Sequence, residues 1–310
     1  MMQIRKAYGE ALVRFAEDYD YYVMDADVAN ATMSCIFRDA YPDRFIDMGI
    51  AEDNMFGYAA GISLCGMPVF ASAFAPFSAG RAYDQIRNSI MYPGCNVKVV
   101  VTHGGIQAGM DGGSHQCVED IALMRAIPKS VVLCPADERE TFACVKAAIE
   151  HQGPVVLRIG RSDGGTLHDS DVDVKIGRGF LLRDGADVAV IAAGTVVNAA
   201  LQAAKTLAAQ GIDVAVVSMT SLKPLDEELV LACAEKTNCI VTFEDHNVIG
   251  GLGGAVCELL SEKRPTPVTR HGVMDRFGCS GTEAELAVKF GLDEAGITGA
   301  ILKAYRNKKR

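Results

Sequence analysis

The sequence predicts an α/β protein of two domains, each built on a mostly parallel sheet with helices on both faces. Short β-branched runs alternate with longer helical patterns along the 310 residues. A segment rich in Gly, Asp and Ser interrupts this alternation once, and the length suffices for two cores. We therefore predict a first domain at residues 1–165, a linker at 166–186 and a second domain at 187–310.

The first domain consists of apolar strand candidates separated by amphipathic helix candidates. This order favours parallel strands, because crossover helices cover both faces of the sheet and leave its strands buried. The strand candidates are residues 21–24, 44–47, 69–73, 97–102, 130–134 and 154–158. The helix candidates are residues 5–18, 51–64, 79–91, 116–126 and 138–151.

The linker is indicated by Gly164-Gly165, by a cluster of Asp and Ser, and by Gly177 and Gly179. Such a composition is typical of a connection between domains. A second, shorter alternation follows it. The strand candidates there are residues 188–192, 214–217, 239–243 and 268–270. The helix candidates are residues 196–209, 226–234, 255–261 and 283–289.

The composition excludes several classes of protein. With 49% hydrophobic and 22% charged residues, the chain is not intrinsically disordered. Its net charge of −9 argues against a surface for nucleic acid or for an anionic membrane. We see neither a signal peptide nor a run of about 18 apolar residues. The ten cysteines include no CxxC pair, so we expect reduced thiols in a cytoplasmic protein.

The most informative segment is residues 102–116, which leaves the C-terminal end of a predicted buried strand. Open α/β sheets place their sites there. His103 and His115 bracket five glycines and one carboxylate, Asp111. Glycines let the backbone approach a ligand, and imidazoles exchange protons near neutral pH. A glycine-rich surface loop has the same pattern. A metal site is less favoured, because no spacing supplies further ligands.

Two charged residues and one glycine cluster add to the candidates. Glu52 opens a mostly apolar helix, where a carboxylate complements the helix macrodipole or, in a water-poor setting, holds and shares a proton. Arg161 follows an apolar strand and suits a carboxylate or phosphate, although a solvated linker charge has the same sequence. The glycines at 250–254 lack the third Gly of a dinucleotide fingerprint, so we predict a tight strand-to-helix connection.

Several motifs occur together, in order, as in one family. Residues 48–52, Met-Gly-Ile-Ala-Glu, resemble the Gly-Ile-x-Glu element of transketolases, and residues 102–116 resemble their two-histidine loop. Residues 125–128, 135–141 and 242–247 are similar to further landmarks. The chain thus resembles the C-terminal two-thirds of transketolase over nearly all its length. This resemblance implies a thiamine diphosphate-binding fold, followed by a fold like the transketolase C-terminal domain.

The resemblance also implies a chemistry. Transketolases bind thiamine diphosphate between subunits and transfer a two-carbon ketol unit from a ketose to an aldose. By resemblance, Glu52 hydrogen-bonds the aminopyrimidine ring, while His103 and His115 bind substrate oxygens and move protons. The other residues implied are Phe77, Asp27 and Ile50 for the cofactor, and Asp111, Arg161 and Arg5 for the substrate.

One family element is missing from the sequence. Thiamine enzymes hold the diphosphate through Mg²⁺ with a Gly-Asp-Gly element, which does not occur in these 310 residues. We therefore expect no metal ligands on this chain. We expect an N-terminal transketolase subunit as partner, carrying the diphosphate-binding domain and the Mg²⁺ ligands. The resemblance further implies self-dimerisation through the pyrimidine-binding and C-terminal domains, and hence a heterotetramer.

Alternatives stay open at this point. Residues 50–52 also resemble 1-deoxy-D-xylulose-5-phosphate synthase and the beta subunits of 2-oxo acid dehydrogenases, and a non-catalytic regulatory subunit is a third interpretation. The presence of both His103 and His115 favours transketolase, because those relatives generally lack the first. Residues 29–32 lack the serine that helps transketolases bind phosphate, so sugars and sugar phosphates are both possible substrates.

Overall fold

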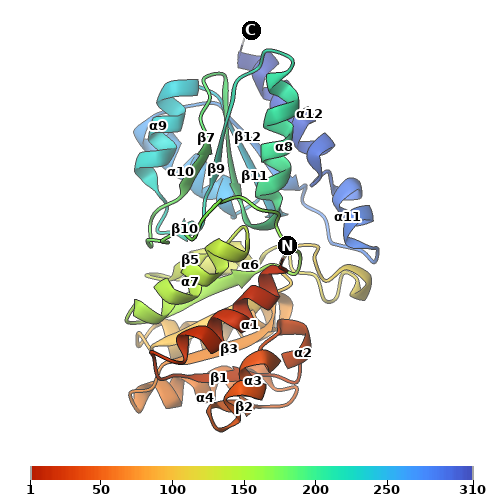
Figure 1. Cartoon of the computed structure of the whole chain (residues 1–310). Coiled ribbons are helices and arrows are strands. Elements are labelled where there is room, and N and C mark those ends of the chain that lie inside the picture. Colours follow the sequence, from red (N-terminus) through yellow and green to blue (C-terminus); the bar gives the residue numbers. More distant parts are fainter. Residues whose placement is uncertain (1, 309–310) are drawn as a thin grey trace.

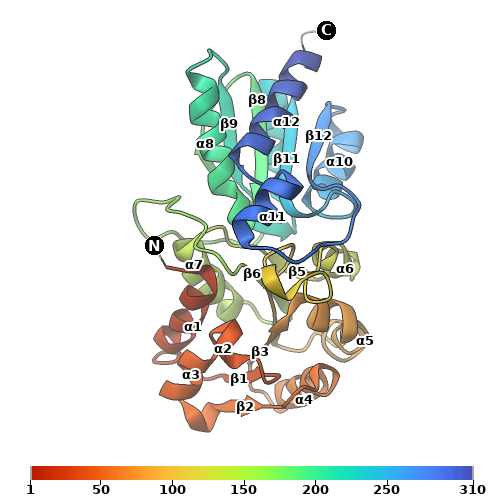
Figure 2. The ribbon, with the colours of Figure 1, turned by 90° about the vertical axis from the view of Figure 1, so that its right-hand side faces the viewer.

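The computed structural model describes residues 2–308, which form two domains stacked end to end (Figure 1). Each domain is a sheet covered by helices on both faces, which confirms the predicted α/β class. Helix α1 (Ile4–Phe15) begins near the junction of the domains, and α12 (Glu294–Lys308) runs to the far end of the second (Figure 2). Among the described residues, no helix is both long and apolar enough to cross a bilayer.

The first sheet has seven strands in the order β10-β5-β6-β4-β3-β1-β2. Strands β1 to β6 run parallel, and β10 pairs antiparallel with β5 although it comes from a segment far beyond the first domain. The central strands are buried on both faces, as apolar runs between crossover helices predict. The strands are β1 (Tyr22–Asp25), β2 (Phe45–Asp47), β3 (Val69–Phe74), β4 (Val97–Thr102), β5 (Val131–Leu133), β6 (Val155–Ile159) and β10 (Ser221–Lys223).

Two groups of helices cover this sheet. Helices α1, α3 and α7 pack on one face, while α4, α6 and the turns from η2 to η3 pack on the other. Successive strand residues point to opposite faces, so Phe70 packs with the first group and Ala71 with the second. Besides α1, the helical segments are α2 (Ala29–Thr32), α3 (Cys35–Ala40), η1 (Pro42–Arg44), α4 (Glu52–Leu64), η2 (Pro76–Arg81), α5 (Tyr83–Gln85), η3 (Ile86–Met91), η4 (Gly109–Asp111), α6 (Asp120–Ala126) and α7 (Glu138–Glu150).

The second sheet has five strands in the order β12-β11-β8-β9-β7, of which only β7 is antiparallel to its neighbour. Helices α8 and α12 cover one face, and α9 and α10 the other. The strands are β7 (Phe180–Arg183), β8 (Val188–Ala193), β9 (Val214–Ser218), β11 (Ile240–Asn247) and β12 (Val268–Val273). Besides α12, the helical segments are η5 (Gly194–Val196), α8 (Val197–Ala208), α9 (Glu227–Thr237), α10 (Leu252–Lys263) and α11 (Glu283–Phe290).

The structure differs from the sequence expectations in several elements. Helices α2, α3 and α12 lie where no helix was expected, and α12 is 15 residues long. Strand β7 lies within residues 166–186, so part of the expected linker joins the second sheet; the domain boundaries stay a prediction. Strand β10 returns from the second half of the chain to the first sheet. Residues 79–91 are not one α-helix, because π-helical turns flank the short α5. Apolar periodicity alone does not reveal such turns.

The parallel strands β6, β4, β3, β1 and β2 bring their carboxyl ends to one edge of the first sheet. Each loop that leaves this edge carries a residue predicted for the site. Asp27 follows β1, Glu52 follows β2, Phe77 follows β3, His103 follows β4 and Arg161 follows β6. The topology therefore gathers residues that are spread over the first 161 positions of the sequence.

Candidate functional site

Glu52 is a buried carboxylate at the start of α4, with a side chain only 3% exposed. Its Oε2 accepts a hydrogen bond of 2.7 Å from Nη1 of Arg81, whose side chain is 49% exposed. The sequence suggested an apolar, water-poor setting for Glu52. The burial agrees with that expectation, but the carboxylate also has a cationic partner that sequence reasoning did not find.

Phe77 lies on the π-helical turn η2, four residues before Arg81. The Arg81 guanidinium covers its ring, with the carbon centre 4.6 Å from the ring centroid. Phe74, at the end of β3, stacks on Phe77 at 6.1 Å with an interplanar angle of 8°. Arg81 therefore joins the carboxylate of Glu52 to an aromatic surface made by two phenylalanines.

Both predicted histidines touch this aromatic surface. The ring of His115 meets Phe77 edge-on at 5.4 Å, and its Nδ1 lies 3.0 Å from the Ser114 hydroxyl. The ring of His103 lies 4.2 Å from Phe74. Residues from the loops after β2, β3 and β4 thus form one continuous series of contacts, from Glu52 to His103.

His103 is held in an unusual environment. It is buried, its backbone has a positive φ of 57°, and its Nδ1 lies 3.1 Å from Thr102 Oγ1. Burial, followed by the positive charges of Arg5 and Arg161, lowers the pKa of His103 to about 3. The imidazole is therefore neutral at physiological pH, and one ring nitrogen can accept a hydrogen bond while the other donates one.

Arg5 and Arg161 form the cationic side of the site. Arg5 donates from Nη1 to the carbonyl of Ala31 at 2.9 Å, and Arg161 from Nη1 to that of Ala108 at 3.4 Å. Burial, and then the charge of Arg161, lowers the pKa of Arg5. The two guanidiniums are close enough for the charge of one to affect the other, and such a pair attracts an anionic group such as a phosphate or sulfonate.

The other predicted residues lie at the rim of the sheet edge. Asp27 is exposed with a φ of 62°, and its backbone N–H donates to Oδ1 of Asp47. Ile50 is 77% exposed. Asp111 is exposed at the end of η4, and its carboxylate has no hydrogen-bond partner within residues 2–308. These three are not in the contact series, and their roles stay predictions.

The glycine cluster at 250–254 forms the tight connection that we predicted. Gly251 is the N-cap of α10, and the carboxylate of Glu244 accepts from the backbone N–H groups of Leu252 and Gly253 at 2.7 and 2.8 Å. The start of this helix is therefore already occupied by a side chain of the protein. Burial raises the pKa of Glu244 to about 7.

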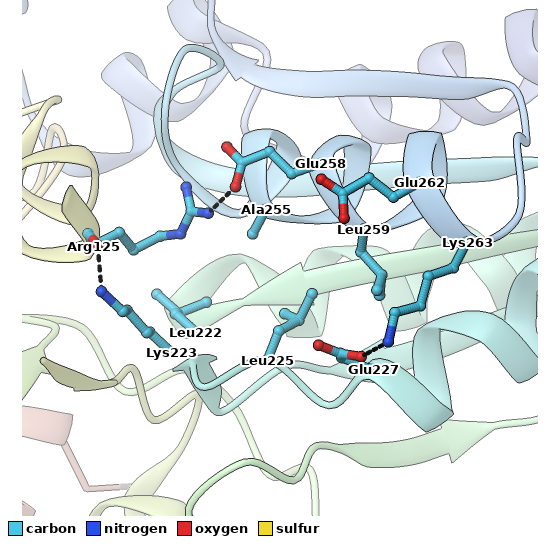
Figure 3. Close-up of a pocket in the computed structure, with 10 residues that line it drawn as sticks. All are labelled: Arg125, Leu222, Lys223, Leu225, Glu227, Ala255, Glu258, Leu259, Glu262 and Lys263. Carbon is cyan, nitrogen blue, oxygen red and sulfur yellow. Dashed lines mark hydrogen bonds and ion pairs between the residues drawn. The ribbon is translucent and has the colours of Figure 1, made fainter. Parts of the chain in front are cut away.

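A separate cavity of about 370 Å³ lies between α9, α10 and the first domain, away from these residues (Figure 3). Its cations are already engaged: Arg125 pairs with Glu258, Lys223 donates to the Arg125 carbonyl, and Lys263 pairs with Glu227. We interpret it as part of the joint between domains. Within residues 2–308, no group of three or more His, Cys, Asp or Glu is placed to hold a metal ion.

Sequence reasoning missed Arg81 and gave Phe74 no role. The spacing of four residues between Phe77 and Arg81 was a usable signal, because it places two side chains on one side of a helical turn. Phe74 ends a buried strand, where its aromatic ring gives no sign of a role other than packing.

Comparisons with known proteins agree with both domains. Residues 1–165 match the pyrimidine binding domain of transketolase, and residues 177–297 match the transketolase C-terminal domain. A putative transketolase C-terminal section from Methanocaldococcus jannaschii is 41% identical over 309 residues, which cover 98% of this chain and 97% of the relative. A 6-deoxy-6-sulfo-D-fructose transketolase subunit from Clostridium sp. strain MSTE9 is 40% identical, with coverages of 98% and 95%.

A solved structure is also similar over its whole length. It is a split-gene transketolase in an inactive beta4 tetramer, which is 47% identical and superposes with a TM-score of 0.92 over 99% of both chains. The chain therefore belongs to the transketolase family and contains that family's pyrimidine-binding domain, followed by its C-terminal domain.

Proposed function

We propose that this chain is the C-terminal subunit of a thiamine diphosphate-dependent transketolase, which acts together with an N-terminal subunit. The reaction transfers a two-carbon ketol unit from a ketose, or ketose phosphate, to an aldose acceptor. The observation that carries this proposal is the contact series from Glu52 through Arg81, Phe77 and Phe74 to His103, with His115 against Phe77.

The pyrimidine half of thiamine diphosphate fits the chemistry of these residues. A buried carboxylate, joined through Arg81 to a flat aromatic surface, offers a hydrogen-bond acceptor near a stacking partner, which suits an aminopyrimidine. Glu52, Phe77, Ile50 and Asp27 would hold this half of the cofactor. When bound, thiamine diphosphate supplies the carbon nucleophile and the electron sink for carbon–carbon bond cleavage. In this proposal Glu52 holds and releases a proton at its carboxylate, protected from water by its burial.

The substrate is assigned to the histidine and arginine side of the site. Neutral His103 accepts or donates a hydrogen bond at a substrate oxygen, and His115 moves a proton beside the aromatic surface. Asp111, exposed at the end of η4, accepts from a substrate hydroxyl. Arg5 and Arg161 bind an anionic group at the far end of the sugar. One relative is named for a sulfonated ketose, in agreement with an anionic substrate.

The partner subunit in this proposal carries the diphosphate-binding domain and the Mg²⁺ ligands. Support comes from the absence of Gly-Asp-Gly in this sequence. Relatives that match over 97% and 95% of their own lengths are named as a transketolase section and a transketolase subunit. Self-association of this chain is part of the proposal, and the similar solved structure is a tetramer of beta subunits.

The test is an assay of ketol transfer with the two subunits purified together, in the presence of thiamine diphosphate and Mg²⁺. We expect Glu52→Gln to reduce turnover at least about 100-fold, because general acid–base groups contribute about that much. Asp53→Asn is the matched control, since Asp53 is the exposed neighbour in the same helical turn. Unchanged turnover in Glu52→Gln would contradict the mechanism, and full turnover by this chain alone would contradict the need for a partner.

A further inference from the structure

At its N-terminal end, the loop that carries Asp111 and His115 is bonded to the second domain through one buried carboxylate. Asp245, near the end of β11, is 3% exposed. Its Oδ1 accepts from the backbone N–H of Ile106 at 3.0 Å, and its Oδ2 accepts from Nε2 of Gln107 at 3.1 Å. These contacts join residues 139 and 138 positions apart in the sequence.

The fit at this junction leaves no room for a side chain at Gly105. Gly105 has a φ of 69°, and a Cβ added there would lie 2.2 Å from the Asp245 carboxylate. The glycine is therefore required both by its backbone conformation and by the close approach of Asp245. At the other end of the loop, Gln116 donates to the carbonyl of Cys279, so the loop rests against the second domain at both ends (Figure 2).

Gln107 extends the connection to the cationic side of the site. Its Oε1 accepts from the backbone N–H of Arg161 at 2.7 Å, while its Nε2 also donates to Thr195 Oγ1 at 3.0 Å. A single amide thus fixes the loop after β4 relative to the residue after β6. Asp245 orients this amide, because an ionised carboxylate accepts only from its NH₂ end.

The backbone of Asp245 is held independently of its carboxylate. Nη2 of Arg158 donates to the Asp245 carbonyl at 2.8 Å, and Arg158 is paired with Asp120 through a contact of 2.6 Å. A change confined to the Asp245 side chain therefore leaves the joint between the domains in place. It removes the carboxylate contacts that join Ile106 and Gln107 to the second domain, while the contact of Gln116 with Cys279 remains.

We propose that Asp245 and Gln107 are positioning residues, through which the second domain sets the geometry of the substrate side of the site. This inference rests on the proposed function, in which Asp111, His115 and Arg161 contact the sugar. Glu52 and Phe77 lie on the segments after β2 and β3, which Asp245 and Gln107 do not touch; Phe77 meets the positioned loop at the ring of His115. Loss of the connection should therefore weaken substrate binding much more than cofactor binding.

The test exchanges donor and acceptor across the contact. In Asp245→Asn, an NH₂ group faces either the Ile106 N–H or the Gln107 NH₂, and in Gln107→Glu two carboxylates face each other. In the double variant, the new amide at position 245 donates to the new carboxylate at position 107 and still accepts from the Ile106 N–H. The second oxygen of that carboxylate accepts from the Arg161 N–H, and the Thr195 hydroxyl turns to donate.

The matched control is Asp275→Asn. Asp275 is an exposed carboxylate of the second domain, and it accepts a hydrogen bond from the Asn247 amide at 3.2 Å. The control therefore makes the same chemical change as Asp245→Asn in the same domain, but outside the connection to the loop.

Three measurements on the assembled enzyme decide the matter: KM for the sugar substrate, affinity for thiamine diphosphate, and hydrogen exchange of residues 104–116. We expect each single variant to raise KM about 10-fold and to speed exchange in the loop, with cofactor affinity within about 2-fold of wild type. The double variant should recover KM to within about 3-fold and restore the slow exchange. The control should match wild type in all three.

Several results would overturn the inference. KM in the single variants could stay within about 2-fold of wild type, or cofactor affinity could fall in parallel with substrate affinity, as a merely structural role predicts. The double variant could also be no better than the worse single variant. Failure of the proposed function has a different signature, because the wild-type complex would then show no ketol transfer, while the exchange measurement would still report on the loop.

Discussion

The pair formed by Glu52 and Arg81 offers a direct test of the site in the protein as it stands. We consider Arg81→Met, which keeps most of the side-chain volume and removes the charge. Glu52 is 3% exposed and bonded to Arg81 at 2.7 Å, so this change leaves a buried carboxylate without its cationic partner. The aromatic contact between Arg81 and Phe77 is lost as well.

The size of the effect follows from the burial of the two partners. Breaking a fully buried ion pair costs about 3–5 kcal/mol, whereas exposed pairs are worth about 0.2–1 kcal/mol. With Arg81 half exposed, we expect about 1–2 kcal/mol from the pair and about 0.5 kcal/mol from the cation–π contact. A total near 2 kcal/mol lowers the Tm of a chain of 310 residues by about 3 °C.

The assay is a double-mutant cycle measured by thermal unfolding of the isolated chain. Glu52→Gln removes the buried charge, so Arg81→Met should cost much less in the Glu52→Gln background than in wild type. We expect a coupling free energy of about 1–2 kcal/mol. Additive effects, with a coupling below about 0.3 kcal/mol, would show that the pair does not stabilise Glu52 and would refute this reasoning.

Three further predictions concern titration and substrate charge. Burial and the charges of Arg5 and Arg161 lower the pKa of His103 to about 3. Its NMR signals should therefore not titrate between about pH 5 and 8, and an inflection near pH 6.5 would contradict this prediction. The unfolded chain takes up this proton first on acidification, so stability should fall below about pH 6.5, and less so in His103→Gln. Burial raises the pKa of Glu244 to about 7, so the folded chain keeps a proton that the unfolded chain releases near pH 4.5. The free energy of unfolding should therefore fall as the pH rises from about 4.5 to about 7. In calorimetry, Glu244→Gln should flatten this pH dependence, and an equally steep fall in the variant would count against the prediction. Arg161→Met should raise KM for a phosphorylated sugar by about 10- to 100-fold and change KM for the unphosphorylated sugar by less than about 2-fold. Equal effects on both sugars would show that Arg161 does not bind the anionic group.

Much of the first domain could be predicted from sequence, because its strands are apolar runs and its helices have a periodic apolar face. Of the residues gathered at one edge of the sheet, only His103 and Arg161 could be placed at strand ends from the sequence, whereas Asp27 and Phe77 were named by resemblance to transketolases. Strand β10 could not be found, since three residues, Ser221 to Lys223, carry no period. The connection of Asp245 to Ile106 was equally hidden, because its partners are 139 residues apart and meet only after both domains have formed.

Strand β10 also has a practical consequence for anyone who divides this protein. A fragment that stops after the first domain would lack β10 and would therefore expose the edge of β5. The unpaired N–H and C=O groups of that edge could pair with a strand of another chain. If the C-terminal domain were exchanged for that of a relative, β10 would be exchanged with it. The first sheet would then contain one strand from the relative. The workable unit for truncation, transplantation or redesign is thus the entire two-domain polypeptide.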